Sequence, residues 1–352
     1  MRDAITLVEQ VIAGKLPQRA PMFDLIRNDA VIEHFAGQPL TVENAPEIIP
    51  PVYPKAIDVT RSVRMPDAPA EFIDEEGRHH KTFRWTIWNE HTRYENAAAY
   101  AAAKKQRIAD FDPAWNAEGQ RLMDWEWDHN RTQQEQFGEA CYWMPCGAGV
   151  NLMSAFGEIG LEQFSYYLAD CPDVIDELLE VQTLDAVRWV SHYPDDHGVA
   201  AMMMGDDIAF KGGPIFSPAW FETHYFHRLA RVIDAYHAKG IKVMFHSDGN
   251  IMPILPQLVE AGIDGLNPIE VMAGMDIKAI NKRYPHLFMT GGIDVSELLP
   301  FGKPEDIFEI TRQTIYDGGG RLMIGSSTEL QNCVPAENFL AMRRAVLETP
   351  YY

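Results

Sequence analysis

The sequence predicts an α/β fold, and more closely a single (β/α)8 TIM barrel with an N-terminal elaboration of helices and loops. Two observations predict it. Short apolar runs alternate with longer helical patterns, which is typical of βα units around a parallel sheet. Nearly every apolar run also ends in polar residues at its C-terminal end, where barrel enzymes place their active sites. An open, doubly wound sheet would gather strand ends similarly, but no G-x-G-x-x-G or P-loop sequence follows any run.

Apolar runs mark the predicted strands. They occupy residues 20–26, 199–207, 241–248, 263–270, 286–294 and 321–327. The predicted helices between them cover residues 217–240, 251–262, 276–285 and 303–320. Ser217 and Pro218 suit an N-cap and a first helical turn, and Gly240 and Gly262 follow helix ends. Repeated βα units are therefore predicted for the C-terminal half.

The N-terminal part is less regular. Residues 38–80 are rich in proline and charge and predict irregular loops with a strand near AIDVTRSVRM. Residues 81–90 alternate like an antiparallel strand, and residues 94–135 are predicted to be helical. We interpret residues 1–130 as an elaboration that includes the first strand, within one domain spanning residues 1–352.

Composition excludes several classes of function. The chain has 30 basic and 51 acidic residues and a formal net charge of −21, so it should repel nucleic acid and anionic membranes. No apolar run is long enough to span a membrane. The charged, amphipathic start does not resemble a signal peptide. Four cysteines are too few for a disulfide scaffold, so a reduced, cytoplasmic protein is expected.

His246 and Asp248 follow the apolar run that ends at Phe245, in the stretch FHSDGN. Because side chains alternate along a strand, residues two apart point to the same side. That arrangement suits two ligands of one metal ion, or a histidine acting beside a carboxylate. In the structural alternative, Asp248 or Asn250 caps a helix that begins near Ile251.

Glu329 and Cys333 follow the last predicted strand, which neighbours the first strand in a closed barrel. With His246 and Asp248, Glu329 would complete a hard ligand set for zinc or another divalent ion. Cys333 would add a soft thiolate, although it also suits a small buried residue against the next helix. We therefore treat His246, Asp248, Glu329 and Cys333 as candidate metal ligands.

Asp206 and Asp207 end a very apolar run, and adjacent strand residues point to opposite sides, so only one can face the barrel mouth. We favour Asp207, as an acid/base group or substrate contact; a helix cap or an ion pair with Lys211 is the alternative. The candidate catalytic residues are then Asp207, His246 and Asp248. Further polar residues at strand ends are candidate substrate contacts: Asp24, Arg27, Asn267 and Glu270.

Five segments carry a family resemblance. In order they read DDIAFKGGPIFSPAWF, HAKGIKVMFHSDGNI, GIDGLNPIE with a following GMD, FMTGGID and VPAENFLAM, and lie within about residues 150–348. The series resembles the uroporphyrinogen decarboxylase superfamily, and more closely its branch of cobalamin-dependent methyltransferases. PMFDLIRNDAVIEHFAG resembles the first strand and its continuation more loosely. The resemblance implies a TIM barrel, often dimeric, with its site at the C-terminal ends of the strands.

The resemblance also implies a zinc site. In the methyltransferase branch, H-x-C-G after this strand and a second cysteine after the last strand hold the ion. His246 matches the family histidine, Asp248 stands where the first cysteine is expected, and Ser326 or a neighbour stands near the second. Loss of the thiolates argues against activation of a thiol. A His/carboxylate site could still bind zinc and suits a harder partner, such as an ether or alcohol oxygen.

The sequence departs from true uroporphyrinogen decarboxylases in a second place. Those enzymes resemble this chain but carry an R-Q-A-G-R segment after the first strand to hold substrate carboxylates. Here the region reads DLIRNDAVIEH, with Arg27 beside Asp24 and Asp29. So acidic a protein offers little cationic complement to an octacarboxylate substrate.

The sequence and the resemblance together predict a zinc-assisted methyltransferase. It would move a methyl group from a small O-, N- or S-methyl substrate to a corrinoid protein. Two other functions stay open: a metal-free decarboxylase or lyase using Asp207 and Arg27, and a non-catalytic corrinoid or tetrapyrrole binder that uses the tryptophan-rich region. Expected partners are the methyl donor, the corrinoid protein and a second copy of the chain.

Overall fold

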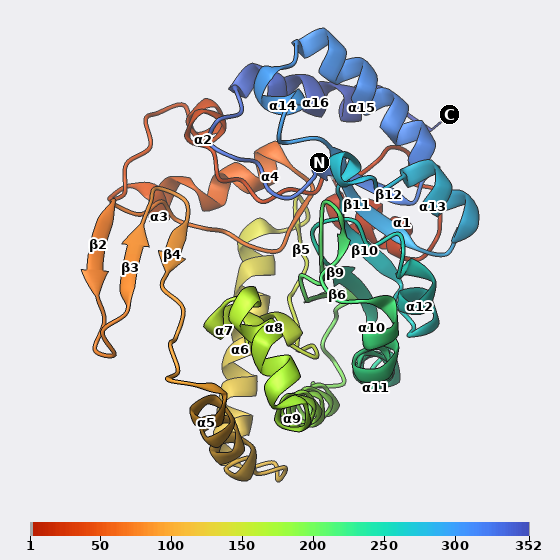
Figure 1. Ribbon diagram of the computed structural model, residues 1–352. Helices are drawn as coiled ribbons and strands as arrows, with labels where there is room; N and C mark the ends of the chain where they lie inside the picture. The colour runs from red at the N-terminus through yellow and green to blue at the C-terminus, as the bar shows by residue number, and fades with distance from the viewer. Residues whose placement is uncertain (1–2, 352) are drawn as a thin grey trace.

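The computed structural model describes residues 3–351 and has a parallel five-stranded sheet at its centre (Figure 1). Hydrogen bonds join its strands in the order β12-β11-β10-β9-β6. The strands are β6 (Ala201–Gly205), β9 (Lys242–His246), β10 (Gly265–Ile269), β11 (Phe288–Ile293) and β12 (Leu322–Ser326). Each strand lies inside an apolar run of the sequence, so the predicted α/β fold is confirmed.

Further parallel pairings extend the sheet on both sides. Strands β1 (Val59–Thr60) and β5 (Tyr142–Trp143) pair with each other. Single bridges join the segment around Met22 to β12 on one side and to β1 on the other. Another single bridge joins β6 to the chain that follows β5. These bridges are Met22 to Ile324, Phe23 to Val59, and Cys146 to Met203. The predicted strand at residues 20–26 thus takes part in parallel pairing through isolated bridges.

Two layers of apolar side chains follow from the period of two along the strands. In β6, Met202 and Met204 belong to the large core beneath the helices. Met203, between them, belongs to a second cluster that also contains Met244 of β9 and Met323 of β12. The strands are therefore buried on both faces, which explains their continuous apolar runs.

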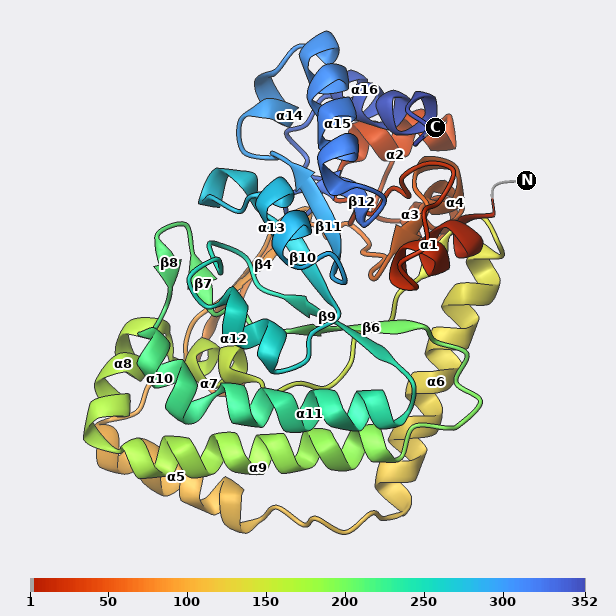
Figure 2. The same cartoon turned by 90° about the vertical axis from the view of Figure 1, so that its right-hand side faces the viewer.

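Helices cover the outer face of the sheet. Helices α9 (Pro172–Ser191) and α11 (Phe226–Ala238) run side by side along one part of it (Figure 2). The others around the sheet are α7 (Leu152–Ile159), α8 (Leu161–Asp170), α10 (Pro218–His224), α12 (Leu255–Glu260), α13 (Ile277–Arg283), α14 (Leu298–Phe301), α15 (Pro304–Gly318) and α16 (Ala336–Glu348). Ser217 caps α10 through its hydroxyl group, as its place before Pro218 predicts. No helix within residues 3–351 is long and apolar enough to cross a membrane.

The N-terminal elaboration consists of three parts. Helix α1 (Ala4–Ile12) lies at the N-terminal ends of the strands, where Arg321 and Lys242 donate hydrogen bonds to its last carbonyl groups. An antiparallel sheet of β2 (Ala70–Ile73), β3 (His79–Thr82) and β4 (Ile87–Asn89) projects to one side (Figure 1). Helices α5 (Ala97–Ala109) and α6 (Ala117–Phe137) follow. The prediction of a single strand at residues 81–90 was wrong. A turn at Phe83–Thr86 divides these residues between two strands, β3 and β4.

Short elements complete this part of the chain. Helices α2 (Asp29–Ala36), α3 (Ala45–Ile48) and α4 (Tyr53–Ala56) follow the first bridge segment. Asn28 caps α2 by accepting a hydrogen bond from the backbone of Val31. The hairpin of β7 (Ala209–Phe210) and β8 (Gly213–Pro214) follows β6.

Candidate metal centre

The C-terminal ends of three neighbouring strands bring polar residues together. In the register of the sheet, Gly205 at the end of β6 lies beside His246 at the end of β9, and His246 lies beside Asn267 of β10. Asp207 follows β6 by two residues and Asp248 follows β9 by two. One potential ligand atom of each of Asp207, His246 and Asp248 lies within 4.8 Å of the others. The fold therefore builds a His/Asp/Asp cluster from two adjacent strand ends.

The imidazole of His246 is held in one orientation. Its Nδ1 lies 2.6 Å from Oδ1 of Asn267, and Nδ2 of Asn267 in turn donates to the hydroxyl group of Thr290. Since the amide oxygen can only accept, Nδ1 carries the hydrogen. This tautomer leaves Nε2 facing Asp207, with 3.3 Å between Nε2 and Oδ1. A histidine oriented by a buried acceptor is the usual arrangement of a metal ligand.

The two carboxylates differ in how they are satisfied. Oδ1 of Asp207 faces His246 and also accepts a hydrogen bond of 3.1 Å from the backbone N–H of Asp248. Oδ1 of Asp248 is buried and has no hydrogen-bond partner. A buried carboxylate oxygen without a donor is costly unless a cation or proton completes it.

The pKa shifts in the cluster follow from this crowding. Burial raises the pKa of Asp248 to about 6, and the charges of Asp207 and Glu270 raise it against the opposing effect of His246. Burial alone would lower the pKa of His246, but its contacts with Asp207 and Asn267 raise it above its ordinary value. Burial would raise the pKa of Asp207, yet the contact with His246 lowers it. Negative charge is concentrated here in a partly buried place.

The residues of this cluster fit a divalent metal ion. They offer one imidazole nitrogen and carboxylate oxygens from two side chains, a donor set that zinc and other divalent ions accept. Oδ1 of Asp248 has no partner, and Nε2 of His246 faces the carboxylate of Asp207, the third side chain of the cluster. Three protein ligands would leave a coordination position for a substrate atom, as in catalytic sites.

Two predicted ligands lie elsewhere. In the described part of the chain, the group of metal-compatible side chains that contains His246 does not include Glu329 or Cys333. Oε2 of Glu329 lies 3.4 Å from Nε of Arg27, so Glu329 forms an ion pair with that guanidinium. Cys333 is exposed, and its Sγ lies 3.9 Å from the side-chain oxygen of Gln331. The structure brings Asp207 to His246 and Asp248 instead.

The predicted substrate contacts have four different surroundings. Asp24 is fully buried and accepts hydrogen bonds from both the backbone and the hydroxyl group of Ser326, so it joins the first strand segment to β12 rather than facing a ligand. Asn267 orients His246. Glu270 accepts a hydrogen bond of 2.7 Å from the backbone of Gly249. Arg27 is buried, with its Nη1 unpaired.

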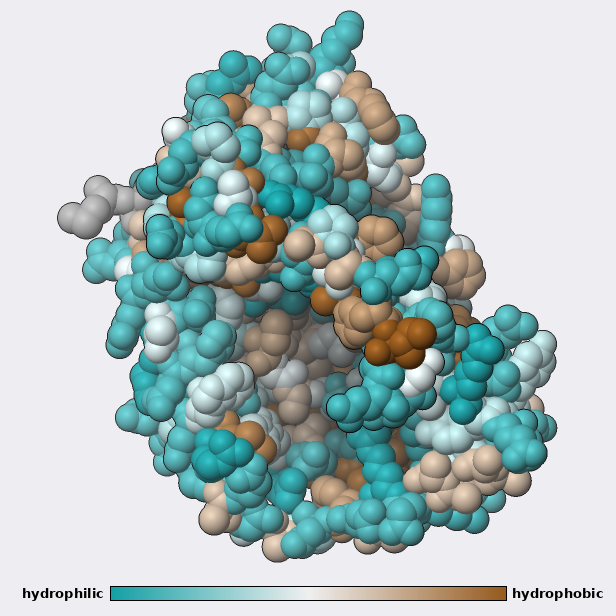
Figure 3. All heavy atoms as spheres, turned by 90° about the vertical axis from the view of Figure 1, so that its left-hand side faces the viewer, coloured by the Kyte–Doolittle hydropathy of each residue, from teal (hydrophilic) through white to brown (hydrophobic). Residues whose placement is uncertain are grey.

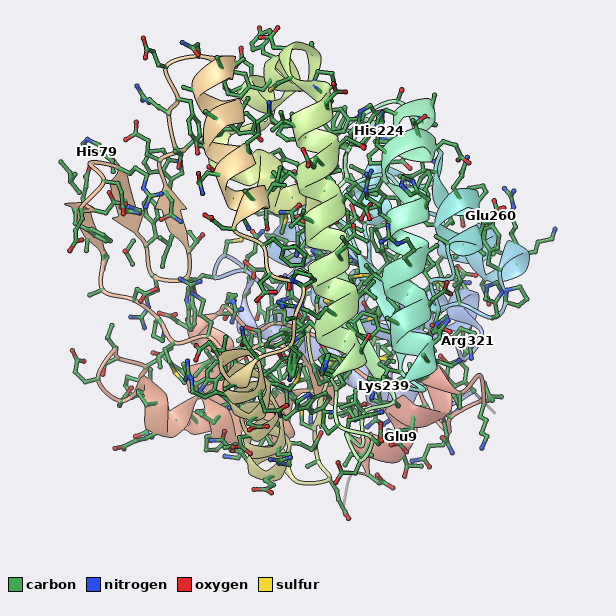
Figure 4. All side chains as sticks on the ribbon, turned by 90° about the horizontal axis from the view of Figure 1, so that it is seen from below. Glu9, His79, His224, Lys239, Glu260 and Arg321 are labelled. Atoms are coloured by element: carbon green, nitrogen blue, oxygen red, sulfur yellow. The ribbon has the colours of Figure 1, made fainter. Side chains whose placement is uncertain are left out.

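Asp206 and His224 have hydrogen-bond partners outside the His246 cluster. Asp206 is buried, and its oxygens accept hydrogen bonds from the backbone of Met153 and the hydroxyl group of Tyr225. Its neighbour Asp207 is the carboxylate that faces His246. His224 lies outside, beside α9 (Figure 4), where Nδ1 is 2.8 Å from Oδ1 of Asp176.

Sequence reasoning missed Arg61 and the cavity beside it. The face that carries β2–β4 and α5 is deeply hollowed (Figure 3). A cavity of about 970 Å³ lies between the loop after β1, the segment after β5, and helices α6 and α9. Arg61 lines it, and the positive charge of Arg61 also acts on Asp207 and Asp248. Arg61, within the predicted strand near AIDVTRSVRM of so acidic a chain, was the available signal.

Strand order, strand-end chemistry and cavity together define the class: an α/β protein with a polar, metal-compatible site at the C-terminal edge of a parallel sheet. The sequence profile of the uroporphyrinogen decarboxylase (URO-D) family matches residues 140–349. The chain therefore belongs to the URO-D family, and the predicted resemblance is confirmed.

Two proteins similar to this chain are methyltransferases of Methanosarcina mazei. A methylated-thiol–coenzyme M methyltransferase of Methanosarcina mazei is 26% identical over 156 residues, which are 44% of this chain and 41% of that protein. The match thus spans about two fifths of the relative. A solved structure, a methyltransferase from Methanosarcina mazei, aligns over 99% of both chains with a TM-score of 0.68 and 15% identity. At that identity the structural likeness supports the fold alone.

Proposed function

We propose that this protein is a metal-dependent methyltransferase that moves a methyl group from a small O-, N- or S-methyl substrate to a corrinoid protein. The observation that carries the proposal is the orphan carboxylate oxygen of Asp248 in one cluster with His246 and Asp207. Membership of the methyltransferase-like branch of the URO-D family supports the reaction class.

The side chains have distinct parts in this reaction. His246, Asp207 and Asp248 would hold the ion, and Asn267 positions the imidazole through Nδ1. When bound, zinc or a similar ion supplies Lewis acidity that makes the heteroatom of the donor a better leaving group. Because Asp248 replaces a thiolate ligand, the site favours a hard donor atom such as an ether oxygen.

A closed (β/α)8 barrel belongs to the same proposal. The five strands of the main sheet, β1, β5 and the segment at Met22–Phe23 make eight parallel segments, and each pairs with the next around the ring. An inner apolar cluster takes side chains from most of them, including Phe23, Val59, Tyr142, Met203, Met244, Phe288 and Met323. Such an inner cluster is what fills a barrel. We also propose that residues 1–352 form one domain and, from the family resemblance, a homodimer.

Metal analysis of the purified protein tests the proposal. We expect about one zinc or other divalent ion per chain, and loss of that ion in His246→Ala. The matched control is His224→Ala, which removes a histidine from an outer helix and should leave the metal content unchanged. A freshly purified wild-type protein that holds no metal and takes up none from added zinc would rule the mechanism out.

One observation favours a second candidate, a metal-free decarboxylase. Buried Arg27 has an unpaired Nη1 that could bind a substrate carboxylate. Turnover of a carboxylate substrate that survives complete removal of metal by a chelator would favour this reaction over methyl transfer.

A further inference from the structure

Three arginine side chains gather where the first two strand segments end. Arg27 follows the segment at Met22–Phe23, and Arg61 and Arg64 follow β1. Only 7% of Arg27 is exposed; its Nη2 donates a hydrogen bond of 3.0 Å to Ser62, while its Nη1 has no partner. The Nε atoms of Arg61 and Arg64 are also buried without a partner. Burial lowers the pKa of Arg27, and the charges of Arg64 and Arg61 also lower it, against the opposing effects of Tyr53 and Glu329.

The carboxylates nearby do not balance these cations. Glu329 lies 3.4 Å from Arg27, and Asp67 lies 2.9 Å from Arg64. Among residues 3–351, no carboxylate comes within ion-pair distance of Arg61. Buried guanidinium N–H groups without acceptors are costly. In a chain of net charge −21, a carboxylate could easily pair with each cation, so an arginine without one is unexpected. The arrangement is therefore best explained by an anion that is part of the ligand.

Arg61 connects this group to both the cavity and the metal centre. It lines the cavity together with Trp125, Trp143 and His129. The ring of His129 stacks on Trp125 and meets the edge of Trp143, so one wall is aromatic. On its other side, the charge of Arg61 acts on His246 as well as on the two aspartates. The rest of a ligand whose carboxylate is held by Arg61 would thus lie in the cavity.

We infer that Arg61, supported by Arg27 and Arg64, binds the carboxylate of an aromatic methyl donor, whose ring lies against the wall of Trp125, His129 and Trp143. This inference rests on the proposed function and names its substrate class. The R-Q-A-G-R segment of uroporphyrinogen decarboxylases is missing, and two of the three cations come from the loop after β1. A guanidinium fork matches a planar carboxylate with two parallel hydrogen bonds, which accounts for the orphan donors.

Binding of benzoate against benzamide tests the inference, because the two probes share a ring and differ in charge. Tryptophan fluorescence can follow the titration, since Trp125 and Trp143 line the cavity. We expect the wild-type protein to bind benzoate at least tenfold more tightly than benzamide. Arg61→Gln should weaken benzoate binding by roughly 10- to 100-fold, the loss of one charge-assisted hydrogen bond, and leave benzamide binding unchanged. Arg61→Lys should retain part of the preference.

Arg107→Gln is the matched control, because Arg107 lines the same cavity but is exposed and lies on α5. It should keep the preference for benzoate. Equal binding of the two probes by the wild-type protein, or equal losses in Arg61→Gln and Arg107→Gln, would overturn the inference. So would an Arg61→Gln variant that loses metal affinity but keeps the benzoate preference, because Arg61 would then only offset the cluster's carboxylates. Benzoate binding needs no metal, so its persistence in metal-free His246→Ala separates this inference from the proposed reaction.

Discussion

Replacing Asn267 by alanine should weaken metal binding without touching a proposed ligand. The substitution removes the 2.6 Å hydrogen bond from Nδ1 of His246 to the amide oxygen, and with it the constraint that presents Nε2. Loss of such an outer partner typically costs 10- to 100-fold in metal affinity, or about 1.4–2.7 kcal/mol. The buried hydroxyl group of Thr290 loses its donor as well, so the free energy of unfolding should fall by about 1–3 kcal/mol.

Competition with a chromophoric chelator measures the metal affinity, and urea unfolding of the metal-free protein measures stability. Asn338→Ala is the control: Asn338 is equally buried, and its amide donates to the carbonyl groups of Leu299 and Gly302, far along the chain from the cluster. It should lose stability and keep its metal affinity. If Asn267→Ala binds zinc within twofold of the wild type, the positioning role of Asn267 is refuted.

Three further predictions concern stability and the ligand set. Gly325→Ala should destabilise the protein by about 1–3 kcal/mol in urea unfolding, because an added Cβ would lie 1.9 Å from the carbonyl oxygen of Phe23; little change would contradict this close packing. Burial raises the pKa of Asp24 to about 6, so the folded state binds a proton that the unfolded state releases near pH 4. Asp24 should therefore contribute a fall of about 3 kcal/mol in the free energy of unfolding as the pH rises through that window, and Asp24→Asn should lack this contribution. Metal at 100 times its Kd should raise the free energy of unfolding by about 2.7 kcal/mol, and Asp248→Asn at the same metal concentration should lose most of that gain.

Much of the fold could be predicted because the strands are buried on both faces. Continuous apolar runs such as the one around Met202–Met204 can hardly be anything other than parallel strands between helices. The error at residues 81–90 has a physical cause: the strands of a hairpin and the residues of its turn can share one alternating pattern. The pairing at Met22 rests on isolated bridges, which depend on distant residues of β12 and leave no local pattern.

The sequence could predict which residues lie at the strand ends, but not which strand ends meet to form the site. His246 and Asp248 could be placed together because they lie two residues apart at the end of one strand. Asp207 joins them because β6 and β9 pair with Gly205 beside His246, a register that the sequence does not encode locally. Glu329 was expected in the same set because the last and first strands meet in a barrel, but it pairs with Arg27 and does not join the group of His246. Charge pairing across strands decides such cases, and it can be seen only in the folded chain.

Asp248 connects the proposed donor chemistry to the arginine group. A thiolate ligand would bind a soft ion such as zinc tightly and favour sulfur donors, whereas a carboxylate with an unpaired buried oxygen favours harder partners. Asp207, Asp248 and Glu270 also place more negative charge at the rim than His246 can balance, and Arg61 acts on both aspartates from the cavity side. A divalent ion would neutralise the carboxylates and leave the positive charge of Arg61 to an anion. Metal loading and carboxylate binding should therefore favour each other, and benzoate should bind more tightly to the zinc-loaded protein than to the metal-free protein. Equal affinities would separate the two sites and leave Arg61 without this link.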